Sequence, residues 1–366
     1  MPVAQLRRRE RLRPAVAALG ADAALITLPA NVRYLSGLAS SNAALLVPAT
    51  SPGATILATD SRYAGTARED CPDLEILIER FIEPALARVA ATLGVRRLAF
   101  EAHEMTVERY EAFAAAVPGT ELVPLGRAVE EIRMAKDEQE IALIARACEI
   151  TSRAFEEIVP LIQPGVTERE LAISLERAMI DLGGDGLAFD TIVASGPNGA
   201  IPHHVPSGRP FAAGDMITVD CGARYQGYHA DMTRTVVLGA PAAWQRDIYA
   251  LVAEAQAAGI DAAVPGADVQ EVDAAARDLI EGAGYGGQFQ HGLGHGVGLE
   301  IHEAPILGYG RTGTLGDRVP ITVEPGIYLP GQGGVRIEDT LVVRAGTGTA
   351  ASQELLTTTT RELLVL

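Results

Sequence analysis

Four carboxylates stand in short segments that are otherwise apolar, β-branched or rich in glycine. They are Asp220, Asp231, Glu324 and Glu338. Carboxylates in such surroundings are costly to bury unless positive charge lies between them. Two divalent cations would carry as much positive charge as the four acids carry negative charge. The acids therefore predict a centre that holds two divalent metal ions per subunit.

One histidine completes this set of metal ligands. His295 lies in the glycine-rich run 291–298, between the two acid pairs along the chain. Oxygen ligands together with one imidazole suit Mn²⁺, which we expect first, and also Co²⁺ or Zn²⁺, which the ligand types do not separate. Two such ions held side by side polarise and clamp a bond for hydrolysis. The pattern thus favours a hydrolytic enzyme.

Two β-hairpins are expected to position the acids. Residues 216–222 and 228–238 are rich in Val, Thr and Ile and flank a short polar turn; a turn centred between Tyr225 and Gln226 would place Asp220 opposite Asp231. Residues 321–329 and 335–343 flank a glycine-rich turn, and Glu324 and Glu338 are symmetric about Gly331. Directly opposed residues share one face of a hairpin, with Cβ atoms ~5 Å apart. Each hairpin should therefore present one acid pair to a common site.

Helices precede each hairpin. An amphipathic pattern predicts a helix over 136–159, and the capping box Thr167–Glu170 opens another that runs to about 182. Helices over 244–258 and 269–282 stand before the second hairpin. Two helices before each metal-bearing hairpin form an internal pseudo-repeat.

The N-terminal part differs in pattern and carries no catalytic motif. Residues 1–125 alternate short strands (23–28, 43–47, 54–58, 97–100) with alanine-rich helices (7–19, 84–93, 107–116), as in a small α/β domain. The arginines at 7–9, 11 and 13 are expected on a solvated opening helix. We predict two domains, 1–125 and 126–366, in an α+β protein, since 366 residues exceed one typical domain.

Composition limits the partners and the compartment. A net charge of −17 argues against nucleic acid, because phosphate binding needs a basic surface. No run approaches ~20 uninterrupted apolar residues, so no membrane partner is expected. The cysteines Cys71, Cys148 and Cys221 are scattered, odd in number and form no CxxC, which favours a reducing, cytoplasmic location. Cys221 follows Asp220 along a strand and should point to the opposite face, into the core.

These motifs resemble the pita-bread metallopeptidases of the aminopeptidase P and prolidase branch. The resemblance covers nearly the whole chain, and segments 31–37 and 59–63 resemble the creatinase-type N-terminal domain of that branch. It implies a C-terminal pita-bread catalytic domain (creatinase/methionine-aminopeptidase-like) over 126–366, preceded by a creatinase/prolidase-type domain over 1–125. It also implies a homodimer.

The resemblance assigns a role to each metal-site residue. Asp220 would chelate one metal and Asp231 would bridge both. His295 and Glu324 would hold the second metal, and Glu338 would bridge. Glu324 would in addition take the proton from the attacking water and pass it to the leaving nitrogen.

Four further residues gain roles from the resemblance. His203, in segment 195–203, and His302, in segment 298–305, would donate hydrogen bonds to the substrate and to the tetrahedral oxyanion. His291 would line the proline pocket, and Arg336 would stand at the mouth of the site. His204 follows His203, so either imidazole could face the substrate.

The implied function is that of an Xaa-Pro aminopeptidase, which removes the first residue from peptides with proline at the second position. The alternative is an Xaa-Pro dipeptidase (prolidase), which shares every motif above. A creatinase-like hydrolase does not need the metal ligands. A non-catalytic pita-bread binding protein would have lost some of them, and all five are present here.

Overall fold

Two compact units make up the chain. The computed structural model describes residues 2–50, 54–346 and 352–366. Contacts between residues divide it into Met1–Arg133 and Met134–Leu366. Each unit contains both helices and strands, as expected for an α+β protein.

The first unit is built on one mixed sheet of six strands, in the order β4-β3-β2-β1-β5-β6. The predicted strands are confirmed as β1 (Ala23–Ile26), β2 (Ala43–Pro48), β3 (Ile56–Thr59) and β5 (Arg97–Phe100). The edge strands β4 (Glu75–Ile78) and β6 (Glu121–Pro124) were not predicted, because their side chains are only partly buried. The helices of this unit are α1 (Pro2–Ala18), α2 (Pro29–Ser36), α3 (Ala64–Asp70), α4 (Ile82–Thr92), α5 (Val107–Ala116) and α6 (Ala128–Met134), the last ending at the unit boundary.

Three of the five arginines expected on a solvated helix α1 are buried, whereas Arg7 and Arg11 are exposed as expected. Arg8, Arg9 and Arg13 are each less than a tenth exposed. Arg9 donates to the Leu35 carbonyl at 2.7 Å and forms an ion pair with Asp73. Their guanidinium groups bury well because backbone carbonyls and a carboxylate accept their hydrogen bonds.

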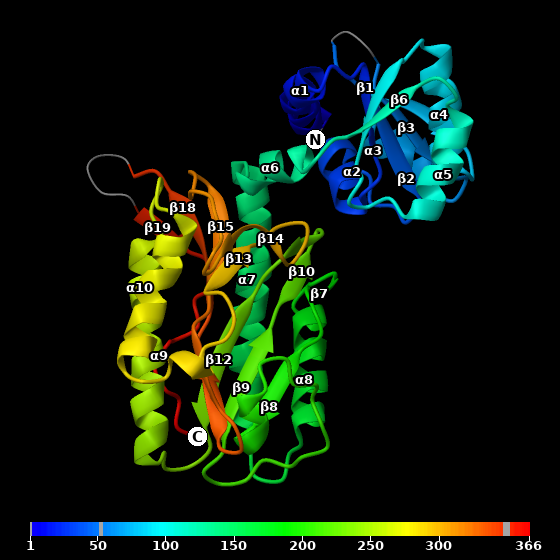
Figure 1. Cartoon of the computed structure of the whole chain (residues 1–366). Helices are drawn as coiled ribbons and strands as arrows, with labels where there is room; N and C mark the ends of the chain where they lie inside the picture. The colour runs from blue at the N-terminus through cyan, green and yellow to red at the C-terminus, as the bar shows by residue number, and fades with distance from the viewer. Residues whose placement is uncertain (1, 51–53, 347–351) are drawn as a thin grey trace. The chain divides into compact units, whose positions relative to one another are not determined.

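Two pairs of helices pack on the strands of the second unit, as predicted. Helices α7 (Glu138–Ile158) and α8 (Glu168–Asp181) pack on each other and on the first hairpin, and both begin with a capping box. Helices α9 (Ala243–Ala262) and α10 (Val269–Gly282), yellow-green and yellow in Figure 1, form the second pair, which contacts strands of the second hairpin. Each pair has its own hydrophobic core, so the pseudo-repeat extends from the sequence to the packing.

Strands of the second unit form four small sheets, in the orders β11-β10-β7, β12-β9-β8, β14-β13-β15-β18-β19 and β16-β17. Their bounds are β7 (Gly186–Leu187), β8 (Ile192–Ser195), β9 (Met216–Cys221), β10 (Ala223–Tyr225), β11 (Tyr228–His229), β12 (Met232–Val237), β13 (Gly294–Gly296), β14 (Glu303–Leu307), β15 (Val319–Val323), β16 (Gly326–Leu329), β17 (Gly333–Arg336), β18 (Asp339–Arg344) and β19 (Ser352–Leu355). Short 3₁₀ turns lie at Val159–Leu161, Gly196–Ala200 and Gly286–Gln288.

The register predicted for the first hairpin is wrong by one position on each strand. Asp220 pairs with Thr233, not with Asp231. The reason is the turn: Gln226 and Gly227 both have positive φ (46° and 78°) and form its two central residues, which moves the centre by one position. Asp231 is two residues before the true partner, and this even offset keeps both carboxylates on one face.

The register predicted for the second hairpin is confirmed. Gly326 pairs with Arg336 in one ladder, and Val323 pairs with Asp339 in the next. Both pairs are symmetric about Gly331. Glu324 and Glu338 fall between these two ladders, where the strands part, and so face each other outside regular pairing.

Residues 364–366 run beside strand β12. The Val237 N–H donates to the Leu364 carbonyl at 3.0 Å, and the Gly239 N–H donates to the Leu366 carbonyl at 2.6 Å. The strand that follows Asp231 therefore has β9 on one side and this segment on the other. Within the described ranges, none of the helices is both long and apolar enough to cross a bilayer.

Candidate metal centre

All nine residues proposed from the sequence line one cavity of about 280 Å³. The hairpins supply the acids, strand β13 supplies His295, and the loops before β9 and β14 supply His203 and His302. The remaining walls are formed by Phe189, Pro202, Gly292, Gly294, Ile301 and Ile306.

The acids and His295 converge at the floor of this cavity. Possible ligand atoms of Asp231, His295 and Glu338 all lie within 4.8 Å of one another. His295 Nε2 is 3.5 Å from Asp231 Oδ2 and 3.4 Å from Glu324 Oε1. These separations suit ligands that share a cation more than direct hydrogen bonds.

Burial and the charge of neighbouring acids raise the pKa values of Asp231, Glu324 and Glu338. Burial is the largest cause of the raised pKa in Asp231, Glu324 and Glu338. The negative charges of the neighbouring acids raise the pKa of Glu338 further. Burial lowers the pKa of His295, but Asp231 and Glu324 outweigh it and raise that pKa to about 9. A cluster whose acids resist ionisation together is one that a cation would stabilise.

Asp220 gives a direct test of whether a cation fits. Its Oδ2 accepts a hydrogen bond from Arg336 Nη2 at 2.7 Å, whereas its buried Oδ1 has no hydrogen-bond partner. A buried carboxylate oxygen without a donor is costly. That oxygen, three other carboxylates and one imidazole make a donor set that fits Mn²⁺, Co²⁺ or Zn²⁺.

Arg336 lies in the cavity wall and is only 4% exposed, so it does not stand at an open mouth as expected. Besides Asp220, it donates to the Tyr328 hydroxyl at 2.8 Å and to Thr233 Oγ1 at 3.1 Å. The Tyr328 hydroxyl is in turn 2.9 Å from His291 Nε2. Burial lowers the pKa of His291 to about 4, so the chain of contacts ends in a neutral imidazole.

The structure separates the adjacent histidines. His203 lines the metal cavity, while His204 Nε2 is 2.8 Å from Glu168 Oε2. Glu168 also accepts from the Ser195 N–H at 2.8 Å and the Ser207 N–H at 3.0 Å. His204 thus helps to fix the loop that carries His203.

His302 reaches the cavity from the other side. Its ring packs edge-on against His295, with ring centroids 4.4 Å apart. In the part of the chain that the structure describes, its ring nitrogens have no hydrogen-bond partner, and it is exposed enough to meet a substrate. The cavity therefore combines a cation-binding floor with histidine donors on opposite walls.

Family comparison agrees with this geometry. A model of metallopeptidase family M24 matches residues 142–345, and a model of the creatinase/prolidase N-terminal domain matches residues 8–135. The chain belongs to metallopeptidase family M24. The pita-bread catalytic domain and the creatinase-type domain before it, both implied by the sequence motifs, are thereby confirmed.

Several M24 proteins resemble the chain over nearly its full length. The Xaa-Pro dipeptidase of Pyrococcus furiosus is 37% identical over 94% of this chain and 95% of its own. The structure of an Xaa-Pro dipeptidase from Bacillus anthracis is 37% identical, covers 99% of this chain and 100% of its own, and has a TM-score of 0.94. An X-Pro aminopeptidase from Thermotoga maritima is 36% identical, with coverage of 96% and 100% and a TM-score of 0.88.

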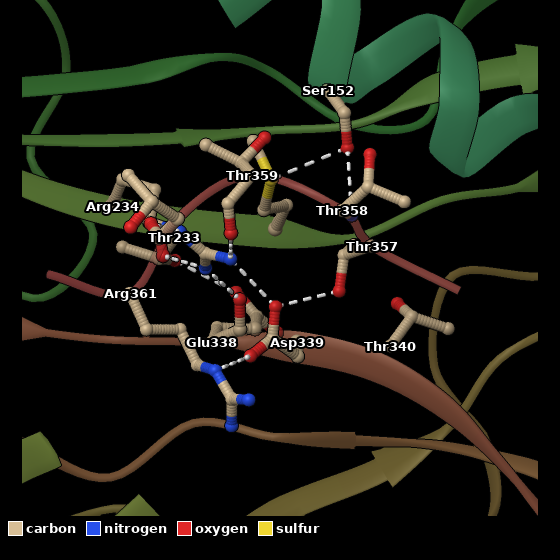
Figure 2. A network of polar contacts seen from close by, with 12 residues as sticks. Ser152, Thr233, Arg234, Glu338, Asp339, Thr340, Thr357, Thr358, Thr359 and Arg361 are labelled. Carbon is tan, nitrogen blue, oxygen red and sulfur yellow. Dashed lines mark hydrogen bonds and ion pairs between the residues drawn. The ribbon is translucent and has the colours of Figure 1, made fainter. Parts of the chain in front are cut away.

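A second polar network surrounds Arg234 and Asp339, next to the candidate metal ligand Glu338 (Figure 2). Every N–H of the Arg234 guanidinium has an acceptor. Nε donates to the Thr360 carbonyl at 2.8 Å, and Nη1 donates to the carbonyls of Thr233 at 2.9 Å and Glu338 at 2.6 Å. Nη2 donates to Asp339 Oδ1 and to the Thr359 carbonyl, both at 2.7 Å.

Asp339 is equally well satisfied. Its Oδ1 also accepts from Thr357 Oγ1 at 2.6 Å, and its Oδ2 accepts from Gln256 Nε2 at 2.7 Å. The network joins residues 357–360 to the backbone of Glu338. It therefore supports the metal-site strands from behind.

Sequence reasoning missed three kinds of residue in this site. Tyr328 lies four residues after Glu324, and no pattern marked its hydroxyl as a link between His291 and Arg336. Glu168 was noticed only within a helix-capping box. The apolar walls Phe189, Ile301 and Ile306 look like ordinary core residues in a sequence, and only the fold shows that they line a cavity.

Proposed function

We propose that this chain is an Xaa-Pro dipeptidase, a metal-dependent M24 enzyme that hydrolyses the bond before proline in dipeptides. The observation that carries the proposal is the convergence of four carboxylates, His295 and two further histidines on one cavity. The relatives from Pyrococcus furiosus and Bacillus anthracis, which bear that name, support it. They favour this alternative over the aminopeptidase that the sequence first suggested.

The proposed metal ligands are those that the donor set fits. Asp220, Asp231, His295, Glu324 and Glu338 would hold two divalent ions, with Mn²⁺ first and Co²⁺ or Zn²⁺ as alternatives. When bound, such ions supply Lewis-acid polarisation of the scissile carbonyl and lower the pKa of water.

The protein's own groups would do the remaining work. Glu324, which is 18% exposed on its side chain, can take the proton of the attacking water and deliver it to the leaving nitrogen. His203 and His302 face the cavity from two walls and would donate hydrogen bonds to the carbonyl oxygen as it gains charge. Arg336 would orient Asp220 through their 2.7 Å bond.

Proline selectivity would come from shape and from a missing donor. An Xaa-Pro bond has no N–H, and its ring fixes φ. His291, held by the Tyr328 hydroxyl at 2.9 Å, presents a rigid neutral wall for that ring. An alanine in place of proline brings an N–H that such a wall leaves unpaired, which costs ~1–3 kcal/mol.

One observation favours the Xaa-Pro aminopeptidase as second candidate. A dipeptidase must hold the carboxylate of the free proline, yet Arg336 is the one Lys or Arg among the described lining residues, and Asp220 already engages it. Phe189, Ile301 and Ile306 make the rest of the wall apolar. Such a wall suits a chain that continues beyond proline.

A substrate panel separates the candidates. Ala-Pro, Ala-Ala, Ala-Pro-Ala and Ala-Ala-Ala should be assayed at one concentration each of Mn²⁺, Co²⁺ and Zn²⁺. We expect Ala-Pro to be cleaved at least about tenfold faster in kcat/KM than Ala-Ala, since ~1.4 kcal/mol is a factor of ten. A higher kcat/KM for Ala-Pro-Ala than for Ala-Pro would favour the aminopeptidase. Equal rates for the proline and alanine substrates would contradict a proline-specific function.

Assembly and location complete the proposal. We expect a homodimer, which sedimentation at assay concentration checks. The three cysteines are free and buried, which supports a reducing, cytoplasmic location.

A further inference from the structure

Lys136 occupies an unusual place for a lysine in this protein. It is the single lysine among 30 basic residues (Lys plus Arg). Its side chain is 2% exposed, and its Nζ lies 2.8 Å from Glu303 Oε2, on a side chain that is 6% exposed. A chain that uses arginine at its other basic positions thus keeps its one lysine in a buried ion pair.

The surroundings of Glu303 explain why an ammonium stands there. The other oxygen, Oε1, accepts the Glu300 N–H at 3.0 Å. A Cβ added at Gly298 would lie 2.8 Å from that same oxygen, so the loop closes tightly over the carboxylate. An ammonium is compact and has three donors, whereas a buried guanidinium needs five acceptors, as Arg234 has.

The same loop carries His302 into the metal cavity. Gly298 fixes its start, because the Gly298 carbonyl accepts the His229 N–H at 2.9 Å and lies 2.9 Å from His229 Nδ1. Glu303, at its end, is anchored by Lys136. Between these two anchors, Ile301 and His302 line the cavity. No hydrogen bond among the described residues holds the His302 ring itself, so its position follows from that of the loop.

We propose that Lys136 is a positioning residue for His302: through Glu303 it fixes the 298–303 loop and so places the His302 imidazole over the metal site. Lys136 touches no reacting atom. It acts through one carboxylate and one peptide bond. The kinetic part of this inference rests on the proposed function, whereas the placement of His302 does not.

The test removes both charges at once. Lys136→Met alone strands a buried carboxylate, which destabilises folds strongly, whereas a neutral pair avoids that cost. The variant to make is therefore Lys136→Met with Glu303→Gln. Arg344→Met is the matched control, because Arg344 pairs at 2.7 Å with Glu138, which lies two residues after Lys136 and has a side chain that is 65% exposed.

Four readouts are needed: unfolding temperature, bound metal, kcat and KM for Ala-Pro, and the ¹³Cε1 signals of the histidines in metal-free protein. The His302 signal is assigned by its loss in His302→Gln. We expect the double variant to fold and bind metal like the control. Its kcat should fall by about 10- to 100-fold with KM changed less, because a donor to the transition state is misplaced. Its His302 signal should shift while those of His203 and His291 stay.

A folded double variant with parental kcat and an unmoved His302 signal would overturn the proposal. So would a fall in kcat without movement of that signal, since Lys136 would then act elsewhere. If the parent cleaves no Xaa-Pro substrate, the proposed function fails, and the His302 signal alone decides this inference. If the double variant does not fold, kcat and the His302 signal are measured in Glu303→Gln with Lys136 intact.

Discussion

Glu338 and Asp339 are neighbours in the sequence and differ completely in their surroundings. Both side chains are buried, at 1% and 0% exposure. Glu338 faces Asp220, Asp231 and Glu324 and accepts one side-chain hydrogen bond, from Thr233 Oγ1 at 2.7 Å. Asp339 faces the other way, into the network of Arg234 and Thr357 (Figure 2). The side chain of Gln256 also donates to it, at 2.7 Å.

The comparison shows that one extended segment, Glu338 and the first residue of β18, can present two opposite electrostatic environments one residue apart, because successive side chains of an extended backbone point to opposite faces. Behind the strand, cationic and neutral donors satisfy the carboxylate. In front of it, Glu338 faces three other carboxylates, whose charges add to burial in raising its pKa. The front face has four carboxylates, and its one arginine, Arg336, is already engaged by Asp220, whereas every donor and acceptor of the Arg234–Asp339 pair on the back face is matched. This asymmetry is the physical signature of a cation site.

The first prediction tests that signature by removing the cation. Chelation should abolish hydrolysis of Ala-Pro, and adding back Mn²⁺, Co²⁺ or Zn²⁺ should restore it, because no protein group in the cavity replaces the lost charge. Elemental analysis of active protein should find two divalent ions per chain. Full activity in protein free of divalent metal would show that the proposed metal centre is wrong.

The second prediction concerns Glu324 at the exposed side of the cluster. Glu324→Gln should lower kcat by more than about a hundredfold, since general acid–base catalysis contributes ~10²–10⁴-fold and a ligand is lost as well. The unfolding temperature should stay near that of the parent. A variant with full metal occupancy and near-parental kcat would show that another group moves the proton.

The third prediction compares isosteric substitutions of Glu338 and Asp339 in metal-free protein. Asp339→Asn leaves the buried Arg234 charge without its partner and should lower the free energy of unfolding by about 3–5 kcal/mol. Glu338→Gln removes a like charge from the front face and should raise the unfolding temperature, by about 2–4 °C for each kcal/mol gained. Thermal and urea unfolding measure both. If both substitutions changed the free energy of unfolding in the same direction, the two carboxylates would not lie in opposite electrostatic environments.

The fourth prediction uses a carboxylate of the satisfied kind away from the metal ligands. Burial raises the pKa of Glu168, but bonds from Ser207, Ser195, Asn198 and His204 outweigh it and lower that pKa to about 2 from 4.5. Because the folded-state pKa is the lower one, the stabilisation is complete above pH ~4.5 and is lost as pH falls toward ~2, for a total of about 3 kcal/mol. Glu168→Gln should flatten this part of the pH dependence, measured by urea unfolding between pH 5 and pH 3. An unchanged slope would show that other acids cause it.

The sequence revealed the front face far better than the back face. Asp220 and Glu338 are anomalous in β-rich runs, so composition alone marks them. Arg234 and Asp339 form a fully satisfied buried pair, and nothing in the sequence says which arginine will meet which aspartate across more than a hundred residues. The buried arginines of α1 escaped prediction for the same reason, because distant carbonyls such as that of Leu35 accept their hydrogen bonds.

Hairpin geometry shows a similar limit. Glycine marked the second turn at Gly331, so its symmetric register could be predicted. In the first hairpin, the positive φ of Gln226 moved the turn, and sequence offers little warning when a residue other than glycine adopts that conformation. The shared face of Asp220 and Asp231 survived because the error in the opposed pair was two residues rather than one.

The pairing of residues 357–366 with strand β12 has a consequence for biosynthesis. Arg234 needs the carbonyls of Thr359 and Thr360, and Val237 needs that of Leu364, yet the ribosome makes these acceptors long after the strand that requires them. While they remain in the exit tunnel, a buried guanidinium lacks part of its hydrogen bonding. The buried hydrogen bonding of the nascent second unit therefore stays incomplete until translation has passed this segment.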